Sequence, residues 1–279
     1  MRRAWYKFSR NKLSVAGLTV VSLVIIVALA APLVAPHPEH AGAFVDYGHA
    51  GTPPGAKYWL GSDQFGRDIL SRIFFAFRGA LIMGIGVLAV VVPVGVLLGL
   101  VAGYFKDTWI ETLIMRTTDI FLALPPLILA LAVCAVLRPT LFNSMMAVSL
   151  AWWPWYTRLV YGMSSSLRNE FYTQAAELTG AGRWHILLRE ILPNCLAPIF
   201  TKMTLDMGWV ILIGSSLSFV GMGEQPPKPA LGTMVADGAK YLPHQWWIAV
   251  FPAVAIMVIV LAFNLLGDGV RDMLSTEEA

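Results

Sequence analysis

The chain has 279 residues, of which 57% are hydrophobic and only 13% are charged. Soluble domains carry about 25% charged residues, so the composition excludes an ordinary water-soluble fold and favours a membrane protein. The net charge of +3 is too small for a nucleic-acid-binding surface, and we expect no such partner. Cys134 and Cys195 both lie in apolar stretches, which favours packing over a disulfide framework.

Six apolar windows are long enough for a transmembrane helix, which needs about 20 mostly apolar residues. They cover about Leu13–Val34, Gly79–Gly103, Ile120–Leu137, Ser144–Tyr161, Cys195–Phe219 and Trp247–Leu266. We therefore predict an all-α membrane protein with six transmembrane helices.

The first window allows two interpretations. A basic segment precedes it, and Ala28-Leu29-Ala30 resembles the cleavage site of a secretory signal peptide. The apolar run continues beyond that site to Val34, however, which is long for a signal peptide. We favour an uncleaved anchor helix and keep cleavage as the alternative.

The distribution of Lys and Arg predicts the orientation of the chain. The residues before the first window include Arg2, Arg3, Lys7, Arg10 and Lys12. Basic flanks of a first helix usually stay in the cytoplasm, and six crossings would return the C-terminus to the same side. We expect an anchor helix and periplasmic segment at 1–78, a transmembrane core at 79–270 and a cytoplasmic tail at 271–279.

The long outer loop from His37 to Arg78 is rich in Gly, Pro and His. Its last part, Gly61 to Arg72, is predicted to turn into an interfacial helix. His37 and His40 are close in sequence, but their spacing does not define a metal site. We therefore expect no bound metal and no cofactor.

The inner loop from Gly162 to Pro193 is predicted to form two short helices rather than a flexible link. Asn169 or Thr173 can cap the first of them, which would run from Phe171 to Thr179. The second would start at Arg183.

Small residues shape this inner loop. Gly180 and Gly182 can supply the left-handed backbone that ends a helix, and Pro193 suits the first turn of the fifth transmembrane helix. Ala175 and Ala176 give a smooth surface that another protein can approach closely. A helix of this length is not stable alone, so we expect it to dock on something.

The same loop carries a recognisable motif. Gln174-Ala175-Ala176, then Gly180, then Leu192-Pro193 have the spacing of the cytoplasmic "EAA" loop, and in this respect the chain resembles the membrane subunits of binding-protein-dependent ABC importers. The sequence departs from the motif at Gln174, which replaces Glu, and at Glu190, which occupies the Ile position. The glutamine keeps hydrogen bonding but loses the charge of an ion-pair partner.

Four further stretches are similar to the C-type permeases of dipeptide, oligopeptide and nickel importers. They are Leu60–Asp68, Arg116–Asp119 with Ala123-Leu124-Pro125, Ser218–Gly223, and Asn264–Gly269. With the inner loop, the matches follow the family's order over nearly the whole chain.

The resemblance implies a division of labour. Such a permease pairs with a second, homologous permease subunit as a heterodimer, with two cytoplasmic ABC ATPases, and with an extracytoplasmic substrate-binding protein. The inner-loop helix would seat on an ATPase and transmit its closure to the membrane helices. The sequence contains no G-x-x-x-x-G-K-[ST] phosphate loop, so we expect a permease in the bacterial inner membrane without its own ATPase site.

Charged and aromatic residues inside the windows suggest further sites. Lys202 and Asp206 lie four residues apart and share a helix face. Charges at such depth cost about 2.5–3.5 kcal/mol each on insertion scales, and the pair is either a polar wall of the substrate path or a self-satisfied structural pair. Trp153 belongs to an aromatic cluster around Pro154, for which we favour core packing over pathway lining.

Two other patterns concern packing. Gly95, Gly99 and Gly103 repeat every four residues, which lets two helix backbones approach closely. We favour a partner helix in the same chain over one in the sister subunit. Arg116 and Asp119 are expected to form a structural pair.

Di- or oligopeptides are the first choice of substrate, and nickel or a metal chelate is the alternative. An intramembrane enzyme is disfavoured because neither H-E-x-x-H nor G-x-S-x-G occurs. A non-transporting scaffold is the remaining class, and it gives no reason for the two inner-loop helices.

Overall fold

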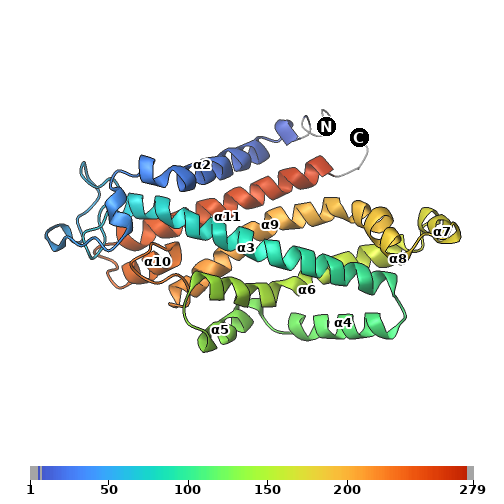
Figure 1. Cartoon of the computed structure of the whole chain (residues 1–279). Coiled ribbons are helices and arrows are strands. Elements are labelled where there is room, and N and C mark those ends of the chain that lie inside the picture. Colours follow the sequence, from blue (N-terminus) through green and yellow to red (C-terminus); the bar gives the residue numbers. More distant parts are fainter. Residues whose placement is uncertain (1–5, 7, 275–279) are drawn as a thin grey trace.

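A computed structural model describes residue 6 and residues 8–274 of the chain as helices joined by loops (Figure 1). The long helices are α2 (Lys12–Val34), α3 (Ile69–Tyr104), α4 (Trp109–Leu122), α5 (Pro126–Val136), α6 (Leu141–Leu167), α9 (Leu192–Phe219) and α11 (Trp247–Leu274). The shorter elements are η1 (Pro38–Ala41), η2 (Tyr47–His49), α7 (Phe171–Leu178), α8 (Arg183–His185), the π-helical η3 (Ile186–Ile191) and α10 (Leu231–Ala239).

Apart from α5, the long helices run side by side and define two ends of one bundle (Figure 1). We call the end that carries α7 the α7 end. The opposite end, which carries α10 and the loop between α2 and α3, is called the α10 end. The single helix α3 reaches from one end to the other.

Four helices are long and apolar enough to cross a membrane: α2, α3, the continuous helix Arg183–Phe219, and α11. The pair α4 and α5 makes a fifth if it is counted as one broken span, since its two halves meet at 86°. The helix α6 covers the predicted window Ser144–Tyr161 and, with 27 residues, is long enough, but it is not apolar enough by the same measure. All-helical architecture is confirmed, while six spans stay a prediction.

The predicted third span, Ile120–Leu137, was wrong as a single helix. The break falls between α4 and α5, at Ala123 to Pro125. Pro125 and Pro126 cannot donate a backbone hydrogen bond, and a proline also disfavours helical geometry in the residue before it. The chain therefore bends where the sequence window suggested continuity.

The helices α3 and α6 pack through the predicted glycine face. A Cβ added at Gly99 would lie 2.7 Å from the carbonyl oxygen of Thr157, and one at Gly103 would lie 2.5 Å from the Cβ of Ser164. Gly95 is equally close to Tyr156. Packing within the chain is thus confirmed, and the glycines allow a backbone separation that larger residues would prevent.

The helix α2 belongs to the packed bundle. Val21, Val24 and Ala28 are part of the main buried cluster. Pro32 lacks the N–H that would bond the carbonyl of Ala28, and the Arg78 guanidinium of α3 donates to that carbonyl instead. It also donates to Leu29 O at 2.8 Å, so α2 is tied to α3 near the α10 end.

Candidate functional site

The inner-loop helix α7 spans Phe171–Leu178, close to its predicted bounds. The predicted cap was wrong: Glu170 occupies the capping position without a side-chain hydrogen bond, and Thr173 instead donates its hydroxyl to Leu167 O at 2.8 Å. Asn169 lies before the cap and bonds Ser165 O. The helix is therefore held by packing on the bundle rather than by its own cap.

The two faces of α7 differ in exposure. Four residues at helical spacing point away from the bundle, and we call them the docking stripe: Phe171, Gln174, Ala175 and Leu178. The exposed fractions are 87% for Phe171 and 89% for Leu178. Large apolar side chains exposed on a short helix outside the long bundle helices are a candidate interaction surface.

The opposite face of α7 packs on the bundle. Thr173 is fully buried, and Ala176 packs on a second cluster of buried apolar residues at the α7 end. The two adjacent alanines thus separate: Ala175 lies in the docking stripe, while Ala176 faces inward. Neighbouring helix positions point in different directions, so the two alanines differ in exposure. That another protein approaches this surface stays a prediction.

The backbone after α7 turns at one glycine rather than two. Gly180 has a φ of +83°, as predicted, whereas Gly182 has an ordinary negative φ of −68° and precedes α8. The second predicted helix does not end before the membrane segment. It continues through η3 into α9, and Leu192 and Pro193 form the first turn of α9.

The pair Lys202–Asp206 lies between α9 and α6. The Lys202 Nζ is 3.1 Å from Asp206 Oδ2, and the ammonium also lies 5.3 Å from the ring centre of Tyr156 and 5.9 Å from that of Trp155. Asp206 is buried, while Lys202 is partly exposed and Trp155 is 44% exposed. The aromatic faces stabilise the cation, and the group reaches the surface of the bundle through Lys202 and Trp155.

Trp153 does not join this group. Its ring meets Phe121 of α4 edge to face at 5.5 Å between centroids, and its carbonyl faces Gly95 of α3. Trp155 and Tyr156 flank the lysine instead. The sequence shows four aromatic residues close together, and all lie on α6: Trp152, Trp153, Trp155 and Tyr156. It does not show how α6 is rotated, and this rotation decides which two of them face Lys202.

Asp119 pairs with Arg158 of α6. The predicted pair of Asp119 with Arg116 was wrong. The pairing ties α4 to α6. An arginine from another helix competes successfully here because both partners are at facing positions of packed helices.

The α10 end holds a buried network of charges. Asp63 receives the Arg67 Nε at 2.7 Å, and the Arg72 Nε lies 3.7 Å from the same carboxylate. All three side chains are nearly excluded from solvent. The predicted interfacial helix at Gly61–Arg72 was wrong: residues 61–68 form a turn, and Asp68 then caps α3 by accepting from Ser71 N at 2.9 Å.

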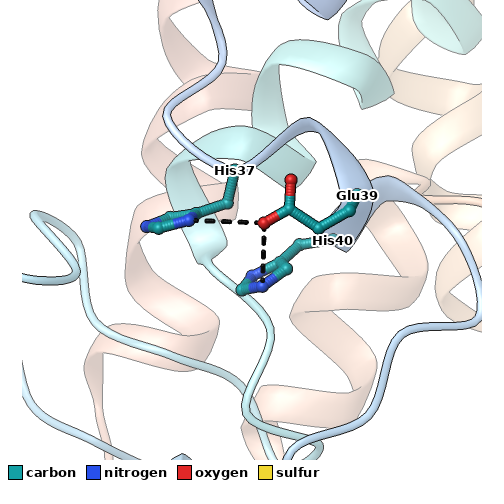
Figure 2. A group of neighbouring side chains, drawn as sticks. All are labelled: His37, Glu39 and His40. Carbon is teal, nitrogen blue, oxygen red and sulfur yellow. Dashed lines mark ion pairs between the residues drawn. The ribbon is translucent and has the colours of Figure 1, made fainter.

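Two histidines and a glutamate come together in the same region (Figure 2). Glu39 Oε1 is 3.5 Å from His37 Nδ1 and 3.6 Å from His40 Nε2. The Asp68 N–H donates to His40 Nδ1 at 2.8 Å, so the proton of the neutral ring is on Nε2, facing Glu39. Metal-ligating histidines have the opposite arrangement, with the second nitrogen acting as a donor. The cluster therefore suits hydrogen bonding better than metal binding.

His40 joins the outer loop to α3. Its ring stacks on Phe44 at 4.0 Å between centroids, and its carbonyl accepts from Arg72 at 3.0 Å. Burial and the neighbouring His37 lower its pKa, while Glu39 and Asp68 act in the opposite direction. The neutral imidazole is the form that fits the Asp68 hydrogen bond.

Residues 95–277 match the family described as binding-protein-dependent transport system inner membrane component. Residues 1–54 match the N-terminal TM domain of oligopeptide transport permease C. The chain belongs to the first of these families, the membrane permease subunits of ABC importers in the bacterial inner membrane. In this family ATP hydrolysis resides in a separate subunit.

Curated relatives match over nearly their full length. The chain is 39% identical to the di/tripeptide transport system permease protein DppC of Pseudomonas aeruginosa, over 98% of this chain and 91% of the relative. It is 38% identical to the glutathione transport system permease protein GsiD of Pectobacterium atrosepticum, over 98% and 90%. A chain of the MetNI methionine ABC transporter, in inward-facing conformations, shares the fold with a TM-score of 0.55 at 16% identity, covering 72% of this chain and 93% of that one.

Proposed function

We propose that the chain forms half of a translocation pathway for di- or oligopeptides. The relatives described above are named for di- and tripeptides and for glutathione, itself a tripeptide, which supports peptides over nickel. The proposed topology has six crossings. The helices α4 and α5 together form one broken span, and α6 is a separate, continuous span. It keeps the anchor and periplasmic segment at 1–78, the core at 79–270 and the tail at 271–279.

The α7 end is the cytoplasmic end in this proposal, as are both termini. The docking stripe then faces the cytoplasm, where an ABC ATPase can cover Phe171 and Leu178. This exposed apolar stripe is the observation that carries the proposal. Gln174, Ala175 and Gly180 complete the contact, while Leu192 and Pro193 connect it to α9.

The other proposed partners follow from the family. A homologous permease subunit supplies the second half of the pathway, and two ATPase subunits bind the two inner loops. A substrate-binding protein delivers cargo at the α10 end. Neither nucleic acid nor a cofactor is part of the proposal.

We further propose that the exposed side of the Lys202 group lines the path. Lys202 is charged, partly exposed and held in place by a buried carboxylate, so it can meet the carboxylate of a passing peptide. Trp153 is less suited, because its ring packs against α4.

The test is co-purification and peptide uptake after co-expression with the cognate ATPases, sister permease and binding protein. Leu178→Glu and Phe171→Glu should each lose most of the retained ATPase and peptide uptake, because a buried carboxylate would face an apolar groove. Lys106→Glu, exposed in the turn between α3 and α4, is the control at the same end. Unchanged ATPase retention in both stripe variants would refute the proposed docking.

A further inference from the structure

One side-chain contact ties the bundle-facing side of α7 to α3. The Tyr104 hydroxyl donates to Glu177 Oε1 at 3.0 Å. Tyr104 is the last residue of α3 and is buried, while Glu177 keeps access to solvent on its outer side. Glu177 lies on the same side of α7 as Thr173 and Ala176, opposite the docking stripe.

The tyrosine ring is held in place from several directions. The guanidinium of Arg168, which follows α6, lies 5.3 Å from the ring centre, and Phe105 meets the ring edge to face at 5.2 Å. Tyr104 is also a member of the second buried cluster, together with Ile186 and Leu187 of η3. The Tyr104 hydroxyl therefore has a defined position. Its hydrogen bond to Glu177 can then carry a movement of α7 to α3.

Among the described residues, the side-chain hydrogen bonds from α7 to the bundle reach three different long helices. Thr173 bonds α6 at Leu167 O, and the Tyr172 hydroxyl accepts from Asn194 of α9 at 3.3 Å. Glu177 supplies the bond to α3, and it is the one of the three that uses a carboxyl side chain. Hydrogen bonds to charged groups are stronger than neutral ones.

The helix α3 runs from the α7 end to the α10 end (Figure 1). It has 36 residues and is therefore about 54 Å long. At its start, Asp68 caps the helix and Arg72 donates to the His40 carbonyl of the outer loop. A movement of α7 that displaces Tyr104 thus acts on α3, and the first turns of α3 contact the outer loop through Arg72.

Gln174, which stands where the EAA motif has Glu, makes a contact that a glutamate could not make. The Gln174 amide donates to Asn169 O at 3.1 Å, which a carboxylate could not do. The carboxylate within α7 is instead Glu177, which bonds Tyr104 of the bundle.

We propose that Glu177 and Tyr104 are positioning residues that make α3 move with α7, so that the carboxylate at 177 couples ATP hydrolysis to transport in this permease. This rests on the proposed function, in which an ATPase binds α7. The contact acts within the chain and leaves the docking stripe free for the ATPase.

The experiment measures peptide uptake and binding-protein-stimulated ATP hydrolysis of the complete transporter in proteoliposomes. Tyr104→Phe keeps the buried ring and removes only the hydroxyl. We expect the number of peptides taken up per ATP to fall about tenfold, as for loss of a charge-assisted hydrogen bond. ATPase retention should be unchanged. Glu177→Gln should fall by a smaller factor, because an amide oxygen still accepts.

The matched control is Tyr172→Phe, which removes a hydroxyl from α7 itself, where it meets the exposed Asn194. Its coupling should stay within about twofold of the parent. In the double variant Tyr104→Phe with Glu177→Gln, the loss should equal that of Tyr104→Phe alone, because both changes act on the same hydrogen bond. Additive losses, or parental coupling in Tyr104→Phe, would overturn the inference. If the parent transporter retains no ATPase, the proposed function fails instead.

Discussion

The two ends of the bundle are built in opposite ways. The α10 end buries charged side chains in a hydrogen-bonded network around Asp63, Arg67 and Arg72. The α7 end exposes apolar side chains on a short helix that has no side-chain cap. Breaking a buried ion pair is costly, whereas an exposed apolar stripe is a candidate surface for a partner. We call the α10 end the rigid end and the α7 end the receptive end, and α3 runs between them.

The largest expected effect comes from breaking the rigid end. Asp63→Asn removes the carboxylate that pairs with Arg67 and lies beside Arg72. Removing one partner of a buried ion pair costs about 3–5 kcal/mol. Unfolding of the purified chain in detergent measures the loss. Glu170→Gln, an exposed carboxylate at the α7 end, is the control, and an equal loss there would contradict the contrast between the ends.

The second prediction concerns the packing of α3 on α6 between the two ends. Gly99→Ala puts a methyl group 2.7 Å from Thr157 O and should cost about 1–3 kcal/mol through overpacking of α3 on α6. Gly162→Ala is a matched change in α6, because nothing lies within 4 Å of its added Cβ. That variant should be neutral or more stable by up to about 1 kcal/mol. Thermal unfolding of both variants separates close packing from helix propensity.

The attachment of the receptive end is weaker. Thr173→Val keeps the shape of the buried side chain and removes its hydrogen bond to Leu167 O. We expect a local cost of about 1 kcal/mol. Amide hydrogen exchange should rise in α7 and not in α3. Equal rises in both helices would show that α7 does not open independently.

The smallest effect is a pH dependence at the rigid end. The His40 pKa is lowered in the folded chain, chiefly by burial, so the unfolded chain binds this proton more readily. Stability from His40 is thus fully present above the ordinary pKa of about 6.5 and is lost as pH falls through the lower folded value. Unfolding measured from pH 7.5 down to 5 should show a shallower decline in His40→Gln than in the parent. A parallel decline would assign the effect to other groups.

Much of the receptive end was predictable from sequence because its features are local. The helix bounds of α7, the left-handed Gly180 and the first turn of α9 at Pro193 depend on a few neighbouring residues. The motif Gln174-Ala175-Ala176 also identified the family. Which alanine faces the bundle could not be read from the motif, since that requires knowing the surface on which α7 packs.

The rigid end was predictable only in part. The stretch Gly61–Arg72 was recognised as a distinctive segment, but its predicted helix was wrong. Its residues are organised by partners far away in sequence, such as His40, which accepts from Asp68 N. Local propensity does not contain such contacts.

The sequence by itself determined that this is a membrane protein, that it is helical, which family it belongs to, and that α3 has a glycine face. These follow from composition, length of apolar runs and spacing, which act through local physics. Only the tertiary structure decided that Asp119 meets Arg158, that Lys202 sits against Tyr156 and Trp155, and that Glu177 reaches Tyr104. Those pairs depend on the rotation and register of packed helices, which are set by close packing across the bundle rather than by any one segment.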